Sequence, residues 1–146
     1  MVGYTLMVAR QFPTNHPRRG EPTNFVENIG KTKIHTIRSN FELWQDRFDK
    51  IAGWKAVLNL KYWEGRPYHS TPIHFLTLDK KDGIGIQNLK FADSLYDFAI
   101  DYRYPYVDFN KVAENDGLTE IDAQNWFRKY DLSKPMALIQ LTEFRY

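Results

Sequence analysis

The sequence predicts an α+β domain, in its simplest form a small β-barrel with helices packed outside it. Several segments read as antiparallel strands, and segments with helical periodicity lie between them in irregular order. The chain has 146 residues, which is enough for one hydrophobic core and too short for two large ones. We therefore expect a single domain over residues 1–146.

The first forty residues predict two strands and a short helix. Residues 4–12, YTLMVARQF, are rich in aromatic and apolar types and predict the first strand. The next twelve residues, PTNHPRRGEPTN, contain three prolines and a glycine, which predicts a loop. Asn24 as N-cap and Gly30 as a stop predict one or two helical turns, and β-favouring residues over 33–38 predict the second strand.

The middle of the chain predicts a helix and three strands. Four apolar residues over 40–53 repeat with the 3.6-residue period of a helix: Phe41, Trp44, Phe48 and Ile51. Residues 55–63, KAVLNLKYW, alternate between apolar and polar types, as in a strand with one face in water. Residues 73–91 resemble a β-hairpin whose Asp82-Gly83 pair supplies the positive φ angles of a tight turn.

The last part of the chain contains the clearest helix signal. Residues 93–110 are rich in tyrosine and predict a helix followed by a loop. Thr119 as N-cap with Asp122 three residues later resembles a capping box and predicts a helix over 119–130. The apolar segment MALIQLTEF, residues 136–144, predicts a closing strand.

Composition excludes several classes of protein. Hydrophobic residues make up 42% and charged residues 26% of the chain, as in an ordinary globular protein, which excludes global disorder. The absence of cysteine excludes thiol catalysis and cysteine zinc sites. No apolar run approaches the roughly 18 residues of a membrane span, and the N-terminal segment does not resemble a signal peptide. We therefore expect a cytoplasmic protein without a membrane partner.

The four histidines are scattered, with no spacing to acidic residues that is typical of a metal site. We expect no metal and no cofactor.

Positive charge is concentrated near the N-terminus. The formal net charge is only +2, but the first forty residues hold acids only at Glu21 and Glu27. The basic residues of the same segment include Arg10, Arg18, Arg19, Lys31, Lys33, His35 and Arg38. Such clustering is typical of a surface that binds an anionic partner such as nucleic acid.

Two motifs occur in a fixed order from about residue 25 to the C-terminus. The first is KTKIHTIR, followed by Trp44, and the second is AENDGLTEIDAQNWF, followed by the closing segment ALIQLTEF. In order and spacing they resemble the ASCH domain, a branch of the PUA-like superfamily of β-barrels. The resemblance implies a PUA-like barrel with a cleft between its open side and the flanking helices. Families of this kind are associated with RNA binding and with modified nucleosides.

One subgroup is similar in a more specific way. Small bacterial ASCH proteins that hydrolyse N4-acetylcytidine to cytidine and acetate carry Lys-x-x-Thr-x-Arg and a later Glu-Asn-x-x-Leu-Thr-Glu. Lys33, Thr36 and Arg38 match the first pattern, and Glu114 begins the second. The resemblance implies Thr36 as nucleophile, Lys33 as the base that activates it, and Glu114 as the carboxylate that orients the site or transfers protons.

This chain is longer than those enzymes. The additional residues precede residue 25, surround the segment 62–72 and fall within 93–110. Loops of this kind at the mouth of a barrel change the shape of a cleft, so the choice of substrate stays open.

The chemistry sets a condition on the backbone. A desolvated lysine can be neutral near pH 7 and accept the proton of a threonine hydroxyl. In a regular strand, however, Lys33 and Thr36 are three residues apart and point to opposite faces. The site therefore requires a turn or bulge between them.

The segment 62–70, YWEGRPYHS, adds a candidate ligand platform. Tyr62, Arg66 and Tyr68 combine aromatic rings with a cation near a loop tip, which suits unpaired bases. With Arg38 they form the predicted substrate-binding set. An ordinary hairpin loop with exposed aromatic residues is the alternative interpretation.

Each candidate residue also has a structural interpretation. Thr36 can be a plain strand residue, Lys33 a solvated lysine, and Glu114 an acid that favours the start of a helix. The aromatic residues Trp44, Trp126 and Phe127 are expected in the core. The alternative function is a non-catalytic RNA-binding module, and an accessory domain that binds another protein is a third possibility.

Overall fold

The computed structural model, which describes residues 1–146, confirms the α+β class. Its elements, in chain order, are β1 (Val2–Met7), α1 (Phe25–Asn28), β2 (His35–Arg38), α2 (Phe41–Ala52), β3 (Ala56–Trp63), β4 (Pro72–Leu78), the 3₁₀ helix η1 (Lys80–Asp82), β5 (Gly85–Phe91), β6 (Phe98–Ile100), α3 (Phe109–Asn115), α4 (Glu120–Phe127) and β7 (Met136–Gln140).

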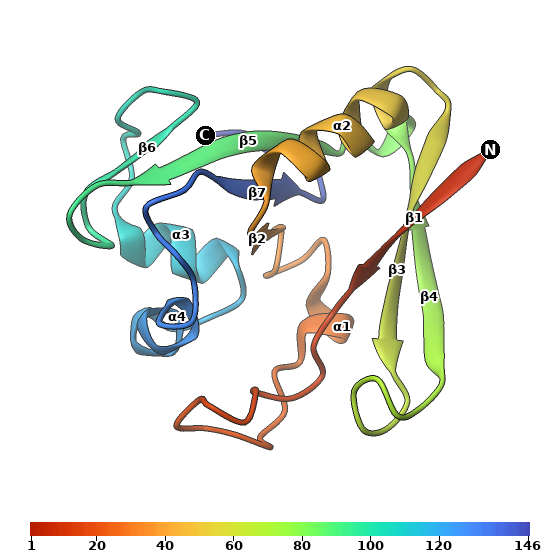
Figure 1. Ribbon diagram of the computed structural model, residues 1–146, viewed down its shortest axis with the longest axis horizontal. Coiled ribbons are helices and arrows are strands. Elements are labelled where there is room, and N and C mark those ends of the chain that lie inside the picture. The colour runs from red at the N-terminus through yellow and green to blue at the C-terminus, as the bar shows by residue number, and fades with distance from the viewer.

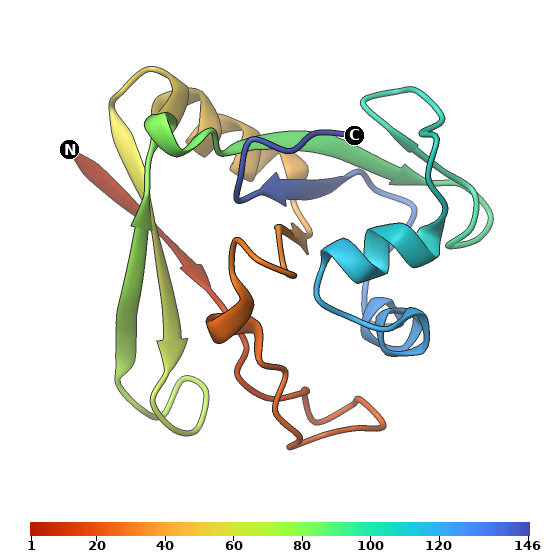
Figure 2. The same cartoon turned by 180° about the vertical axis from the view of Figure 1, so that it is seen from behind.

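The strands form two sheets. One has the order β1-β3-β4 and the other β2-β7-β5-β6, and every pair is antiparallel except β1 with β3. Helix α2 lies across the top between the sheets, while α3 and α4 lie below the four-stranded sheet (Figure 1). The view from behind shows the same arrangement (Figure 2). No closed barrel of paired strands is formed, so the PUA-like barrel stays a prediction.

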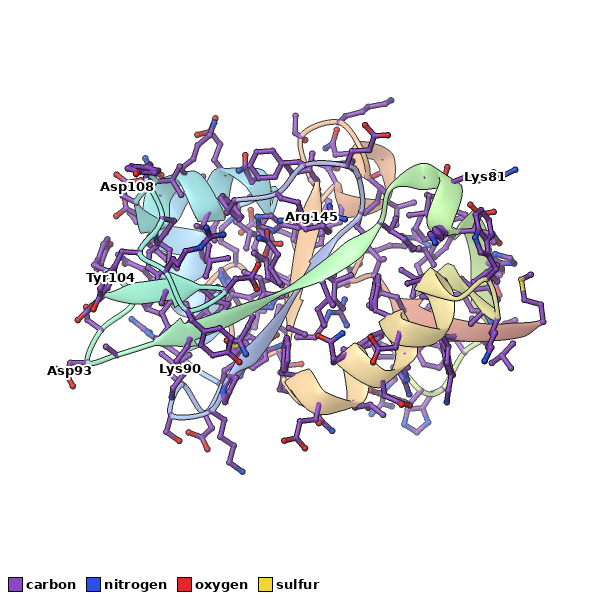
Figure 3. The ribbon with its side chains drawn as sticks, turned by 90° about the horizontal axis from the view of Figure 1, so that it is seen from above. Lys81, Lys90, Asp93, Tyr104, Asp108 and Arg145 are labelled. Atoms are coloured by element: carbon purple, nitrogen blue, oxygen red, sulfur yellow. The ribbon has the colours of Figure 1, made fainter.

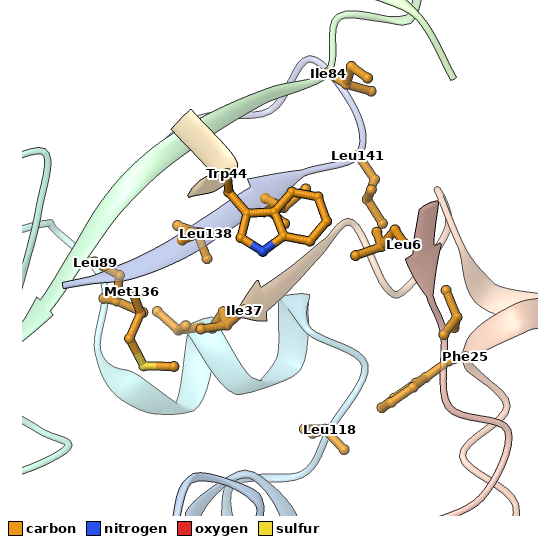
Figure 4. Close-up of a cluster of buried hydrophobic side chains, with 14 of the residues drawn as sticks. Leu6, Phe25, Ile37, Trp44, Ile84, Leu89, Leu118, Met136, Leu138 and Leu141 are labelled. Carbon is orange, nitrogen blue, oxygen red and sulfur yellow. The ribbon is translucent and has the colours of Figure 1, made fainter. Parts of the chain in front are cut away.

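One cluster of buried apolar side chains joins the two sheets and α2. Leu58 and Leu60 on β3 and Leu138 on β7 are completely buried. In Figure 4, Leu6 of β1 and Leu141, just beyond β7, point toward one another, and Trp44 of α2 lies over the same region. Apolar burial therefore holds together sheets that share no strand.

The helix boundaries follow local hydrogen bonds. Asn40 caps α2 by accepting from the Leu43 amide at 3.3 Å, and Thr119 caps α4 by accepting from the Asp122 amide at 3.2 Å. The short α1 begins after Asn24, whose side chain makes no capping bond. These three helices were predicted in the right places.

The first and last strands are shorter than predicted at their C-terminal ends. Strand β1 ends at Met7, and beyond it Gln11 pairs with Pro22 within the following loop. Strand β7 ends at Gln140. The prediction for β3 is confirmed, since Ala56, Leu58 and Leu60 are buried.

The hairpin predicted over residues 73–91 is wrong, although both strands exist. Strand β4 pairs with β3, and β5 pairs with β7 and β6 in the other sheet. Between them, Asp79 caps η1 in a capping box, and Gly83 takes the expected positive φ of 79°. This longer connection carries the chain from one sheet to the other.

The helix-then-loop prediction for residues 93–110 is also wrong. Phe98 and Ile100 are buried on β6, opposite Phe91 and Leu89, and α3 begins only at Phe109. Tyr104 lies on the surface at one end of the molecule, whereas Lys81 lies at the opposite end (Figure 3). Exposed tyrosines with Pro105 among them supply no apolar stripe for a helix.

None of the helices combines the length and the apolar composition that crossing a bilayer requires.

Candidate binding and catalytic cleft

A cleft of about 830 Å³ opens between the two sheets and α4. Its walls come from the end of β1 and the following loop, from β2, from the β3–β4 loop and from the end of α4. Figure 1 shows the loop after β1 between α4 and the β3–β4 loop. The volume falls within the range of about 300–1,000 Å³ found for small-molecule sites.

The structure brings five of the seven predicted site residues to this cleft, namely Lys33, Thr36, Arg38, Arg66 and Tyr68. Tyr62 and Glu114 are not part of its lining.

Lys33 supplies a buried amine to the cleft. Its residue surface is only 2% exposed, and Nζ donates to the carbonyl oxygen of Asp116 at 2.9 Å and to Asp116 Oδ1 at 3.2 Å. Nζ also lies 4.1 Å from the centre of the Phe25 ring. Burial lowers the pKa of Lys33, and the Asp116 carboxylate partly offsets this effect.

The carboxylate beside Lys33 is Asp116 and not Glu114. The Glu114 side chain is 67% exposed and faces Lys111, with 3.8 Å between their charged atoms. Asp116 lies two residues further along the same ENDG turn and forms a β-bridge with Lys33. The sequence motif identified this turn, but the path of the backbone through the turn decides that Asp116 faces inward and Glu114 faces outward.

The backbone meets the condition for Lys33 and Thr36 to share a site. Regular pairing in β2 starts only at His35. Lys33 precedes it in isolated bridges with Ile29 and Asp116. The strand alternation therefore does not extend to Lys33, and both side chains line one cleft.

Thr36 and Arg38 form a hydrogen-bonded pair on β2. Thr36 is 6% exposed, and its Oγ1 accepts from Arg38 Nε at 3.3 Å. A second guanidinium nitrogen of Arg38 donates to the Met7 carbonyl, which links β2 to β1. Burial lowers the pKa of Arg38. No hydrogen bond joins Lys33 Nζ to Thr36 Oγ1.

A buried polar network that no sequence motif predicted lies behind Asp116. His35 Nδ1 lies 3.1 Å from Asp116 Oδ1, and its Nε2 lies 2.7 Å from Tyr146 Oη. The amide of Asn115 donates to the same phenol oxygen at 2.9 Å. A neutral His35 that donates from Nδ1 and accepts the Tyr146 proton satisfies all these bonds. Lys33 and His35 then both donate to Asp116 Oδ1 and together fix its position.

Burial raises the pKa of the Tyr146 hydroxyl, which keeps it protonated as this network requires. No pattern among neighbouring residues predicted this network, because Tyr146 lies 111 residues from His35 along the chain.

Aromatic side chains line the same cleft. Tyr68 is 85% exposed and its ring lies 5.2 Å from that of Trp63. Trp126, expected in the core, is only partly buried and lines the cleft, whereas Trp44 and Phe127 are buried as expected. Tyr62 packs against Phe75.

Comparison of the chain with protein-family models, with curated proteins and with solved structures gave no match.

Proposed function

We propose that this protein is an ASCH-type domain of the PUA-like superfamily whose cleft recognises a nucleobase and hydrolyses an N4-acylated cytidine. The observation that carries the proposal is the convergence of Lys33 and Thr36 on one cleft, despite a spacing that a regular strand would direct to opposite faces. The reaction that the sequence motif suggests requires this geometry, because Lys33 has to reach the Thr36 hydroxyl.

The state of the Lys33 amine suits the role of general base. A neutral amine has two N–H groups and one lone pair. The two N–H groups are donated to the backbone carbonyl oxygen and to Oδ1 of Asp116, which leaves the lone pair free to accept a proton. The lowered pKa of Lys33 increases the fraction in this form at neutral pH.

In this proposal, Thr36 is the nucleophile. Its Oγ1 accepts from Arg38, and its own hydrogen has no acceptor within the protein. Lys33 takes this proton directly or through one water, while Oγ1 bonds to the acyl carbon. The negative charge that develops on the acyl oxygen lies beside the Arg38 guanidinium, which stabilises it.

The remaining steps conserve atoms and protons. Cleavage of the C–N bond releases cytidine, whose N4 receives the proton held by Lys33, and the acyl group stays on Thr36. A water then attacks the ester and gives a proton to Lys33, which returns it to Thr36 Oγ1 as the carboxylic acid leaves.

Incubation with N4-acetylcytidine and other N4-acylated cytosines tests the proposal. We expect release of cytidine by the wild type and a loss of at least about 10³-fold in Thr36→Val, which keeps the branched side chain and removes the hydroxyl. Thr32→Ala is the matched control, because Thr32 is exposed and outside the cleft. Absence of turnover across the panel, or full turnover by Thr36→Val, refutes the mechanism.

A non-catalytic RNA-binding module is the second candidate. Trp63, Tyr68 and Trp126 in a cleft with several cations favour it, since unpaired bases stack on such rings. Affinity for short RNA without any turnover supports this candidate over the hydrolase.

A further inference from the structure

The positive charge of the molecule is concentrated at the cleft. Six of its lining residues are lysines or arginines, and two are carboxylates, Glu64 and Asp116, which leaves a formal excess of four positive charges, or of three when Lys33 is neutral. The whole chain has 20 basic and 18 acidic residues. The rest of the molecule therefore has 14 basic and 16 acidic residues and is net negative. The residues that line the cleft are thus net positive, whereas the remaining residues are net negative.

Most of these cations have no counterion in the protein. Among the six, only Lys33 has a carboxylate within 4.0 Å. Four others are exposed around the opening, and we call them the rim cations: Arg10, Arg19, Arg66 and Lys129.

Two of the four rim cations, Arg10 and Lys129, lie over aromatic rings and do not pair with acids. Lys129 Nζ lies 5.1 Å from the centre of the Trp126 ring, and the Arg10 guanidinium lies 4.8 Å from that of Tyr62. Burial lowers the pKa of Lys129, and the Arg38 charge lowers it further. Uncompensated like charges around one cleft favour an anion that relieves their repulsion.

We propose that the ligand of this cleft is a phosphorylated nucleoside whose phosphate is bound by the rim cations. This inference rests on the proposed function for the base, and it adds the substrate class. The interior residues Lys33 and Arg38 then act on the base and its acyl group. The rim cations act on the charged end of the same ligand.

The chemistry of the rim suits phosphate. Guanidinium groups bind phosphate oxygens in a bidentate manner, and a lysine contributes a point charge. The aromatic residues beside them, Trp63, Tyr68 and Trp126, supply surfaces for a base. A free nucleotide and a nucleotide within RNA share this chemistry, so the experiment separates the two sources.

The test compares the affinities of cytidine, cytidine 5′-monophosphate and a five-nucleotide oligocytidylate, measured by quenching of tryptophan fluorescence. We expect the monophosphate to bind about tenfold more tightly than cytidine at low salt, and this advantage to shrink as salt is added. Equal affinity of the two ligands, or an advantage that does not depend on salt, overturns the proposal.

Two rim variants make the test specific. Lys129→Gln and Arg66→Gln should each reduce the advantage of the phosphate several-fold, measured as the ratio of the affinities of the same variant for cytidine 5′-monophosphate and for cytidine. Lys81→Gln is the matched control, because Lys81 lies at the end of the molecule, outside the cleft (Figure 3). Loss of the phosphate advantage in Lys81→Gln, or its retention in both rim variants, contradicts the assignment to the rim.

The oligonucleotide identifies the source of the phosphate. Tighter binding with a steeper dependence on salt than for the monophosphate indicates a nucleotide within RNA, because more phosphates are contacted. Equal binding indicates a free nucleotide.

The binding test and the turnover test can fail independently of one another. Turnover of N4-acetylcytidine without any phosphate advantage refutes only the phosphate inference. A phosphate advantage without turnover refutes only the hydrolase.

Discussion

At Lys33, two opposing effects act on one amine. Removal from water disfavours the ammonium form, while Asp116 and the Phe25 ring favour it. Burial is the larger effect, so the pKa falls below the ordinary lysine value of 10.5. Lys33 is therefore neutral more often than an exposed lysine, and the Asp116 carboxylate limits the lowering of its pKa.

This balance predicts the pH dependence of the proposed reaction. The protonated amine cannot accept a proton from Thr36, so kcat/KM should fall as the pH decreases through the lowered pKa of Lys33. Asp116 raises that pKa. In Asp116→Asn the acidic limb of the profile should therefore move to lower pH. Measurement of kcat/KM against pH checks this.

Lys31→Gln is the control for the pH profile, because Lys31 is exposed and outside the cleft. An unchanged limb in Asp116→Asn, or a shift to higher pH, would contradict the role of Asp116.

At the scale of elements, the turn between α3 and α4 positions the site. Gly117 has a φ of 80°, and a Cβ built there would lie 3.2 Å from Lys33 Cβ and 3.4 Å from the Phe25 ring. A glycine at this position therefore allows both the left-handed backbone and the close approach of the turn to Lys33. The preceding residue is Asp116, so the same turn directs the buried carboxylate.

Two glycine variants separate backbone strain from crowding. Gly30 has nearly the same φ, 79°, but no atom lies within 4 Å of a Cβ built there. Gly30→Ala should cost about 1–2 kcal/mol from the left-handed conformation alone. Gly117→Ala should cost about 1–3 kcal/mol more, from crowding at Lys33 and Phe25, and should also reduce kcat.

Chemical denaturation of both variants measures these costs. Equal destabilisation would show that the contact of Gly117 with Lys33 places no constraint on the site.

At the scale of the whole molecule, the two sheets are connected by packing and not by strand pairing. Leu60 of β3 and Leu138 of β7 belong to the same buried cluster. The cleft lies along the junction, with Met7 from one sheet and Thr36 from the other in its walls. The integrity of the cleft therefore depends on the shared core.

This arrangement predicts cooperative unfolding. Leu60→Ala and Leu138→Ala should each lower the free energy of unfolding by about 2–5 kcal/mol, because both side chains are completely buried. Each variant should shift one common transition, detected together by tryptophan fluorescence and by far-ultraviolet circular dichroism. Two separate transitions would contradict a single domain over residues 1–146.

Features set by near neighbours in the chain were predictable. Thr119 and Asn40 define helix starts through bonds to residues three positions away, and the alternation of β3 reflects burial of every second side chain. Strand partners were not predictable in this way. Strand β4 pairs with β3 and not with β5, which lies in the other sheet, and no pattern within β4 itself distinguishes between these two partners.

The sequence by itself determined the α+β class and most helices and strands, because short-range bonds and periodic burial depend on residues that are close in the chain. The candidates Lys33, Thr36 and Arg38 came from the resemblance of one short motif to a known family. Only the tertiary structure decided that Asp116 holds Lys33, that His35 and Tyr146 support Asp116, and that Glu114 faces solvent. Lys33 and Asp116 are separated by 83 residues. Their contact depends on how two loops are packed against the core, and no local pattern records that distance.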